Sequence, residues 1–206
     1  DIVQTIRQLL SRGKGLLYLT GHLGVWELLP ALHAVSVPGT TLSIIVRPLD
    51  NPFLDRLVNR YRTCLGYRVI PKKNSIREIL AALKRNETIG ILLDQNVCRA
   101  EGVFVDFFGK TACTNFGLAM LALRTETPVL PIGLFYDESD GVHRVHIEPE
   151  IPLIRTGNKA EDIRLNTAAY TKALETMIRK YPDQWLWVHR RWKTRPEDGD
   201  AQVYSE

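Results

Sequence analysis

Short apolar runs alternate with segments of helical periodicity along most of this 206-residue chain. The runs have the length of β-strands and lie at 15–20, 41–46, 67–70, 88–94 and 128–136. A strand-like run covers 103–108, and the alternating run at 142–149 is typical of an edge strand. Segments with apolar residues at helical spacing separate these runs, at 2–12, 25–34, 51–66, 75 onward, 114–126 and 161–180. Strands that alternate with helices predict an α/β fold, an αβ sandwich whose mixed, mainly parallel central sheet is flanked by helices.

Local signals at the helix ends support these assignments. Pro52 near the start and Gly66 at the end of the 51–66 segment show the expected asymmetry of a helix. Ser75, with Glu78 three residues later, predicts a capping box, and Thr114 is predicted to begin the helix that runs to residue 126. A chain of this length fits one domain, so we expect residues 1–206 to form a single unit, with a polar tail at about 197–206.

The charge and cysteine content exclude several classes of function. Twenty-seven basic and 23 acidic residues leave a net charge of +4, which is too mild to favour nucleic acid as a partner and suits an anionic ligand or a membrane surface equally well. Cys64, Cys98 and Cys113 lack the spacing of a zinc site or a disulfide framework, so we expect reduced thiols. His143 and His146 lie at odd spacing in a predicted strand and cannot share a metal.

No apolar run approaches the ~18 residues that a transmembrane helix needs, and no signal peptide is recognisable. The chain opens without methionine, in what reads as the middle of a helix. We therefore expect a fragment or a trimmed chain, which leaves open a membrane anchor upstream of it.

The strongest candidates for chemistry are three polar residues near two predicted strands. His22 directly follows the run at 15–20, Asp94 ends the run at 88–94, and Glu27 lies five residues after His22. Ligands of α/β sheets bind at the carboxyl ends of the strands, and parallel strands would place His22 and Asp94 at one edge. A carboxylate that holds one imidazole nitrogen leaves the other to accept a proton. In the alternative interpretation, Glu27 merely favours the dipole of a helix start.

Neighbouring loop residues suggest contacts with a ligand, but each of them can also be explained by ordinary turn structure. Gly21 and Gly24 let backbone N–H groups approach an oxyanion, or simply form a turn. Asp94, Gln95 and Asn96 follow one another at a strand end, where polar side chains indicate a site or an Asx-type turn.

Two segments suggest anion binding. The stretch "RPLDNP", which begins with Arg47, leads into a helix on which Arg56 and Arg60 share one face. Guanidinium groups suit phosphate, although such a pair is often just a solvated face. The tail "WLWVHRRWKTRP" interleaves tryptophans with basic residues that include Arg190. Its composition fits a membrane interface or RNA stacking, or tryptophans that pack beside arginines that bind phosphate or stay solvated; we favour a membrane-proximal anionic site.

Motifs of serine hydrolases, nucleotide hydrolases and dinucleotide enzymes do not occur in the sequence. Instead, "TGHLGVWE", "RPLDNPFLD", "LLDQN", "FFGKTACTNFGLAMLALRTETPVLPI" and "WLWVHRRWKTRP" are five blocks in one order between about residues 14 and 196. Together they resemble the blocks of the bacterial lipid A biosynthesis acyltransferases, the lauroyl and myristoyl transferases of the lysophospholipid acyltransferase superfamily. Val25 departs from the asparagine that is frequent at that position.

The resemblance implies an enzyme at the cytoplasmic face of the bacterial inner membrane, usually with an N-terminal hydrophobic helix that this sequence lacks. Such an enzyme moves an acyl chain from acyl carrier protein or coenzyme A to a hydroxyl of a lipid acceptor, typically a lipid A precursor. It needs no metal or redox cofactor, because the acyl thioester is the co-substrate. Another glycolipid, an aminolipid or a lysophospholipid as acceptor, or a non-catalytic lipid-binding module, are the alternatives.

The resemblance also assigns roles to residues. His22 would be the general base, oriented by Glu27 or Asp94, and the acyl transfer would proceed without a covalent acyl-enzyme. Arg60 would hold a phosphate of the donor or the acceptor. The remaining residues expected to contact substrate are Gly24, Arg47, Gln95 and Arg190.

Overall fold

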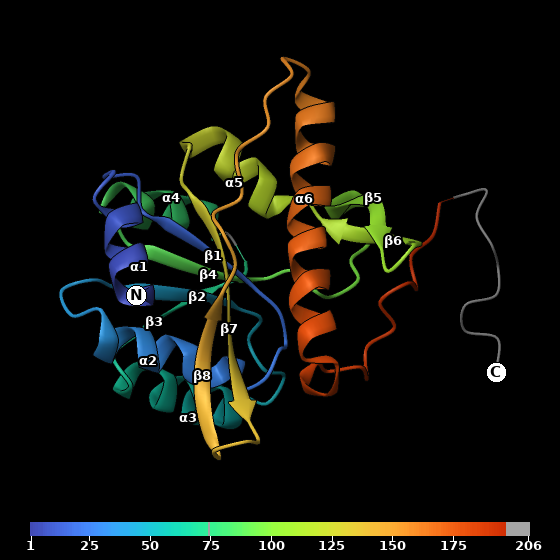
Figure 1. The fold of residues 1–206 in the computed structure, drawn as a ribbon. Helices are drawn as coiled ribbons and strands as arrows, with labels where there is room; N and C mark the ends of the chain where they lie inside the picture. The colour runs from blue at the N-terminus through green and yellow to red at the C-terminus, as the bar shows by residue number, and fades with distance from the viewer. Residues whose placement is uncertain (74, 197–206) are drawn as a thin grey trace.

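The computed structural model describes residues 1–73 and 75–196, and within them the chain folds around one six-stranded sheet (Figure 1). The strand order is β3-β2-β4-β1-β7-β8. The five strands β3, β2, β4, β1 and β7 are parallel, and β8 runs antiparallel to β7 at the edge. The strands are β1 (Leu16–Thr20), β2 (Leu42–Val46), β3 (Arg68–Pro71), β4 (Thr88–Leu92), β7 (Val129–Asp137) and β8 (Val142–Ile147). The predicted α/β fold with a mixed, mainly parallel sheet is confirmed.

Helices cover both faces of this sheet because side chains alternate along each strand. Leu17 and Leu19 of β1 point into a core with α4, α5 and α6, whereas Leu16 and Tyr18 point into a core with α1 and α2. The helices are α1 (Ile2–Leu10), α2 (Leu29–Ser36), α3 (Pro52–Cys64), α4 (Ile76–Lys84), α5 (Gly117–Thr125) and α6 (Lys159–Lys180). Short 3₁₀ turns are η1 (Trp26–Leu28), η2 (Arg99–Glu101) and η3 (Pro182–Gln184).

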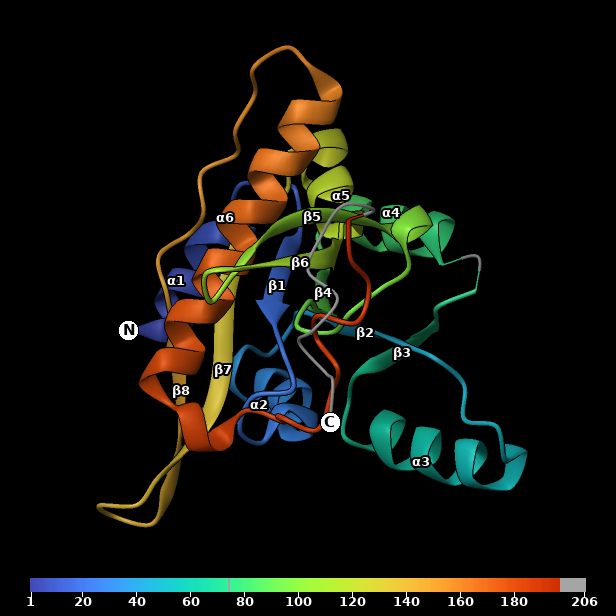
Figure 2. The same ribbon diagram turned by 90° about the vertical axis from the view of Figure 1, so that its right-hand side faces the viewer.

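A separate two-stranded hairpin, β5 (Gly102–Phe107) with β6 (Lys110–Asn115), lies against α6 (Figure 2). The prediction of a helix from Thr114 is wrong, because Thr114 belongs to β6 and pairs with Val103. Its buried hydroxyl accepts a hydrogen bond from Arg191, a contact that local sequence cannot show. The helix begins three residues later, where the side chain of Asn115 accepts from the N–H of Gly117 over 2.7 Å.

Two other helix starts differ from the predictions. The segment predicted as one helix at 25–34 divides into η1 and α2, whose first turn contains Pro30, a residue without an N–H to donate. The capping box at Ser75 does not form, because Ser75 itself has helical backbone angles and its side chain makes no capping hydrogen bond. The predicted tail at 197–206 lies outside the described residues.

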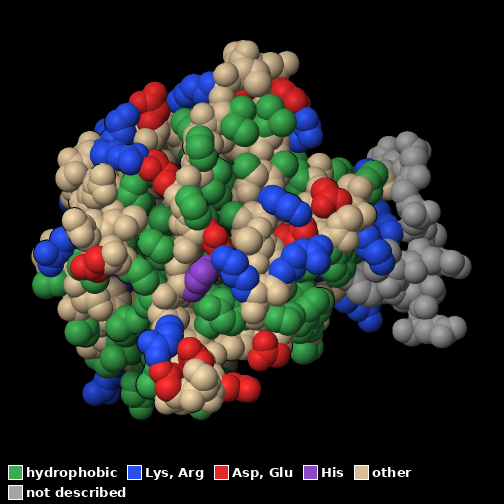
Figure 3. All heavy atoms as spheres, in the orientation of Figure 1, with side chains coloured by type: hydrophobic (Ala, Val, Ile, Leu, Met, Phe, Trp, Pro, Cys, Tyr) green, Lys and Arg blue, Asp and Glu red, His purple; other side chains and the backbone are tan. Residues whose placement is uncertain are grey.

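Charged side chains on the face that carries α6 lie in mixed groups of both signs (Figure 3). Glu175 pairs with Lys172 and Arg179 within this helix, and Lys180 pairs with Glu148. None of the helices in the described ranges combines the length and the apolar character needed to cross a bilayer.

Candidate active site

His22 and Asp94 meet at the carboxyl edge of the sheet because their strands are parallel neighbours. Thr20 at the end of β1 is in register with Leu92 at the end of β4, and each site residue follows two positions later. The imidazole Nδ1 of His22 lies 3.0 Å from Oδ1 of Asp94, and the backbone N–H of His22 donates to Oδ2 over 2.9 Å. The expectation that both residues share one sheet edge is therefore confirmed.

A third residue completes this contact from the far end of the chain. The indole N–H of Trp185 donates to Oδ2 of Asp94 over 3.0 Å. Trp185 is buried, and its ring packs edge-on against Phe107 of the hairpin at 5.6 Å. Sequence analysis placed Trp185 only in a basic, aromatic tail and did not connect it with Asp94. No local pattern indicates a contact across 91 residues.

The environment of Asp94 keeps its carboxylate ionised. Burial alone would raise the pKa of Asp94, which is 3% exposed, but the hydrogen bonds and charge of His22 and the indole of Trp185 outweigh it. The pKa of Asp94 consequently lies below its usual range. An ionised carboxylate beside Nδ1 selects the tautomer with the proton on Nδ1 and leaves Nε2 as the basic nitrogen. Because the His22 side chain is 21% exposed, a substrate hydroxyl can reach it.

Glu27, the other candidate for orienting His22, has a different partner. Its carboxylate forms a two-pronged ion pair with Arg62 of α3, at 2.6 Å and 3.2 Å. Within the described part of the chain, Glu27 forms no hydrogen bond with His22. The interpretation of Glu27 as the direct partner of the imidazole is therefore wrong, and the contact belongs to Asp94.

Arg62 is the arginine of α3 that pairs with Glu27, and the phosphate contact expected of Arg60 stays a prediction. Arg60 is exposed, whereas the side chain of Arg62 is only 17% exposed against Glu27. Residues two apart lie on nearly opposite sides of a helix, so only one of the two can face inward.

The other predicted contact residues lie at the surface around this edge. Arg47 is exposed and pairs with Asp50 over 3.2 Å, and Gln95 and Arg190 are exposed as well. Asn96, next to Gln95, joins the C-terminal segment by donating its backbone N–H to Nε2 of His189 over 2.8 Å. Burial lowers the pKa of His189 despite the nearby charge of Asp94.

The backbone N–H groups of residues 22–25, at the turn expected to hold an oxyanion, already have acceptors within the described chain. The N–H of Leu23 donates to Gly21, that of Gly24 to Gln184 and that of Val25 to Leu134, at 2.7–2.8 Å. The N–H of His22 is held by Asp94. Gly24 is needed for packing instead: its φ is +54°, and a Cβ there would lie 2.1 Å from the carbonyl oxygen of Leu134.

The basic and aromatic tail is partly structural: Trp185 packs, as in one of the alternatives, whereas the buried Arg191 was not expected. Arg191 is 1% exposed and donates to the carbonyl of Cys113 over 2.9 Å, with its guanidinium 4.9 Å from the ring centre of Phe107. Trp187 and Val188 of this segment are exposed, at 54% and 92%.

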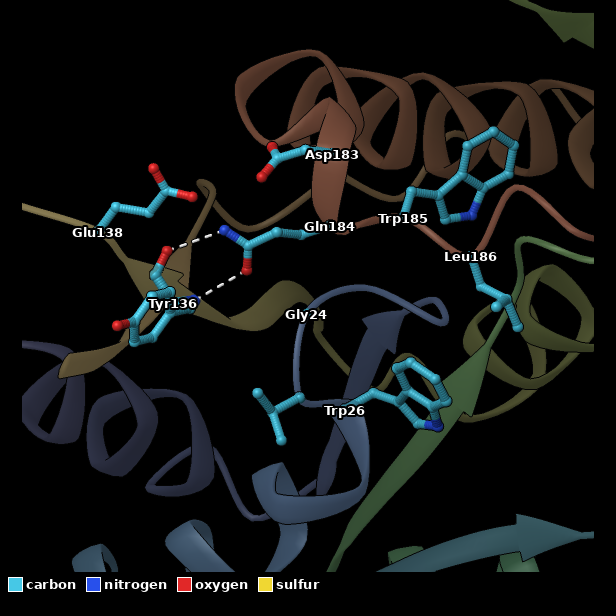
Figure 4. Close-up of a pocket in the computed structure, with 9 residues that line it drawn as sticks. Gly24, Trp26, Tyr136, Glu138, Asp183, Gln184, Trp185 and Leu186 are labelled. Atoms are coloured by element: carbon cyan, nitrogen blue, oxygen red, sulfur yellow. Dashed lines mark hydrogen bonds between the residues drawn. The ribbon is translucent and has the colours of Figure 1, made fainter. Parts of the chain in front are cut away.

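An open cavity of about 360 Å³ is lined in part by Trp26, Trp185 and Leu186 (Figure 4). The Trp26 ring lies 5.1 Å from that of His22. Gln184 and Tyr136 line another part of the cavity. The side-chain oxygen of Gln184 accepts from the backbone N–H of Tyr136, and its side-chain nitrogen donates to the carbonyl of Tyr136, both over 2.8 Å. Aromatic walls beside a basic imidazole nitrogen can position an apolar or ring-shaped substrate group next to the proton acceptor.

Comparison with known proteins identifies the family. A family model described as bacterial lipid A biosynthesis acyltransferase matches residues 3–194. The chain is 28% identical to the lipid A biosynthesis lauroyltransferase of Escherichia coli, over 95% of this chain and 61% of that protein. It is 29% identical to the palmitoleoyltransferase of lipid A biosynthesis from the same organism, over 77% of this chain and 50% of that protein.

A relative with a different named acceptor also matches. The chain is 25% identical to the phosphatidylinositol mannoside acyltransferase of Mycobacterium tuberculosis, over 89% of this chain and 56% of that protein. The chain thus spans about three fifths or less of the length of these curated relatives.

Proposed function

The chain belongs to the family of bacterial lipid A biosynthesis acyltransferases, and we propose that it transfers a fatty acyl group from a thioester to a hydroxyl of a lipid A precursor. The observation that carries this proposal is the contact of His22 with the buried carboxylate of Asp94 at an accessible sheet edge. This geometry suits a general base and requires no nucleophilic side chain.

In the proposed reaction, Nε2 of His22 takes the proton of the acceptor hydroxyl. The oxygen of that hydroxyl attacks the thioester carbonyl carbon at the same time. The carbon–sulfur bond then breaks, and the imidazolium returns the proton to the departing thiolate. Asp94 favours this cycle because its negative charge lies 3.0 Å from Nδ1 and stabilises the imidazolium that forms. The products are an ester and a free thiol, without an acyl-enzyme.

The substrates follow from the family and remain proposals for this chain. The donor is acyl carrier protein or coenzyme A, and the acyl chain lies along the aromatic cavity beside Trp26. The exposed side chains of Arg47, Arg60 and Arg190 would bind phosphate groups of either substrate. The reaction takes place at the cytoplasmic surface of the inner membrane, where the lipid acceptor resides.

A second candidate acceptor is a mannosylated phospholipid. The match to the phosphatidylinositol mannoside acyltransferase over 89% of this chain favours it specifically. The same His22 chemistry serves both acceptors, because each reaction acylates a hydroxyl group.

The test compares acyl transfer by purified wild type, His22→Ala and Asp94→Asn. The reaction is measured through the free thiol that it releases and through mass spectrometry of the lipid product. Loss of a general base lowers the rate about 10²- to 10⁴-fold, and we expect His22→Ala to fall in this range. His143→Ala, at an exposed histidine on β8, is the matched control. Activity of His22→Ala within a few-fold of wild type would show that the base is another group.

The acceptor is decided by offering the wild-type protein a lipid A precursor and a mannosylated phospholipid in parallel. We expect the lipid A precursor to gain the mass of the acyl chain at the higher rate. Faster acylation of the mannosylated lipid would assign the second candidate function instead.

A further inference from the structure

Helix α3 has an apolar face that points away from the protein. It contains no buried residue, and five large apolar side chains on it are between 44% and 74% exposed: Phe53, Leu54, Leu57, Tyr61 and its capping residue Leu65. Phe53, Leu57 and Tyr61 follow one another at intervals of four and therefore form a single stripe. We call these five residues the outer face of α3.

The side of α3 that faces the protein is polar. Asp55 accepts the backbone N–H of Leu49 over 2.9 Å and also binds the amide of Asn59, and Arg62 pairs with Glu27. A surface helix normally turns its apolar stripe to the core and its polar side to water. In α3 this order is inverted, and contiguous apolar patches of that kind mark interaction sites.

The outer face has a basic flank. Arg56 and Arg60 lie one turn apart beside the apolar stripe, and neither forms an ion pair with the described residues. The basic side chains of the α6 face, by contrast, pair with neighbouring carboxylates (Figure 3). An apolar stripe next to unpaired arginines is the composition of a helix that lies in the interface of an anionic bilayer.

The position of α3 relates this face to the candidate active site. It follows the carboxyl end of β2, as His22 follows that of β1, and stands at the periphery of the molecule (Figure 2). The Glu27–Arg62 pair ties it to η1, four residues beyond His22. On the other side, Leu186 donates its N–H to the carbonyl of His22 over 3.0 Å and leads into the exposed Trp187 and Val188.

We propose that the outer face of α3 docks on the surface of a bilayer containing anionic lipids and so presents the His22 edge to its lipid acceptor. This inference rests on the proposed function in one respect: a membrane-embedded acceptor explains why the docking face adjoins His22. A bilayer fits the face better than an acidic protein does, because five large apolar side chains are accompanied by only two arginines.

The test is co-sedimentation with vesicles of phosphatidylcholine, with and without phosphatidylglycerol. We expect Phe53→Ser/Leu57→Ser to bind vesicles at least about tenfold more weakly than wild type, because two large apolar side chains no longer enter the lipid. Arg56→Gln/Arg60→Gln should lose most of the additional binding that phosphatidylglycerol provides. The exposure of these side chains makes misfolding an unlikely complication, and circular dichroism checks it.

Matched controls change exposed residues on other elements. Met120→Ser/Val142→Ser tests apolar loss elsewhere, and Arg7→Gln/Arg124→Gln tests general charge; both should bind as wild type does. Vesicle binding that is equal in all variants would overturn the inference. A Phe53→Ser/Leu57→Ser protein that binds vesicles normally but needs far more acyl carrier protein would identify the face as a protein-docking site and overturn it too.

Transfer to a detergent-dispersed acceptor separates this inference from the proposed function. If docking is the role of the face, Phe53→Ser/Leu57→Ser retains wild-type transfer in detergent while losing vesicle binding. A wild-type protein that binds vesicles through α3 but transfers no acyl group would refute the proposed function and leave the docking inference standing.

Discussion

Trp185 donates its indole N–H to Oδ2 of Asp94 over 3.0 Å, while Oδ1 of the same carboxylate contacts the ring of His22. The C-terminal segment thus holds the residue that orients the candidate base. Loss of this donor should make the carboxylate easier to protonate, because hydrogen bonds to the charged form lower its pKa.

Trp185→Phe keeps a ring in the core and removes only the donor. Since the pKa of Asp94 is depressed, its ionised form is present above that pKa and is lost as the pH falls through it. We expect the acid limb of the pH profile of kcat/KM to move to higher pH, and kcat to fall about tenfold, as for a lost hydrogen bond to a charged group. Trp187→Phe, whose indole donates to Pro182, is the control and should leave the profile in place.

Glu27 and Arg62 should act as a single unit. Glu27→Gln and Arg62→Gln each break the same ion pair, so their effects on the free energy of unfolding should be similar and the double variant should be no worse than either. We expect a coupling of about 0.5 kcal/mol, because the Glu27 side chain is 49% exposed and solvent screens the pair. Additive effects in chemical denaturation, or an acid limb that shifts in Glu27→Gln as in Trp185→Phe, would show that Glu27 acts on His22 separately.

Two glycines with positive φ provide a direct comparison of strain and clash. Gly24→Ala places a Cβ 2.1 Å from the carbonyl oxygen of Leu134, whereas a Cβ at Gly39 meets no atom within 4 Å. Gly39→Ala should cost about 1 kcal/mol of unfolding free energy from backbone strain alone, and Gly24→Ala more than about 2 kcal/mol. Equal losses in urea denaturation would mean that the turn at Gly24 can open without cost.

The stability of the fold should depend on pH through His33. This buried ring contacts the hydroxyls of Tyr18 and Thr40 at 2.9 Å, and burial lowers the pKa of His33 to about 4. Below the unfolded pKa of about 6.5, the unfolded chain binds a proton that the folded chain does not. The contribution of neutral His33 to the free energy of unfolding is therefore complete above about pH 6.5. It declines by on the order of 3 kcal/mol as the pH falls to about 4.

Denaturant titrations of wild type and His33→Gln at neutral and mildly acidic pH test this dependence. The loss of unfolding free energy on acidification should be clearly smaller in His33→Gln. His143→Gln, an exposed histidine, should lose as much as wild type does. Parallel losses in all three proteins would assign the acid sensitivity to other groups.

The sequence by itself determined the α/β architecture and half of the candidate site. Apolar runs of strand length predicted the strands of the six-stranded sheet, because burial on both faces leaves few polar positions in parallel strands. The same pattern placed His22 and Asp94 at one edge, since parallel neighbours end together. Boundaries that depend on local signals were less certain, as Ser75 shows: its capping residue pattern is present and its capping hydrogen bond is not.

Only the tertiary structure decided which side chains make contact. Thr114 became a strand residue because Val103 and Arg191 provide partners that outweigh its tendency to start a helix. Arg62 rather than Arg60 faces Glu27 because α3 is turned with its apolar stripe outward, against the usual rule. Such choices depend on the free energy of contacts between distant segments, which periodicity and propensity along a single stretch do not contain.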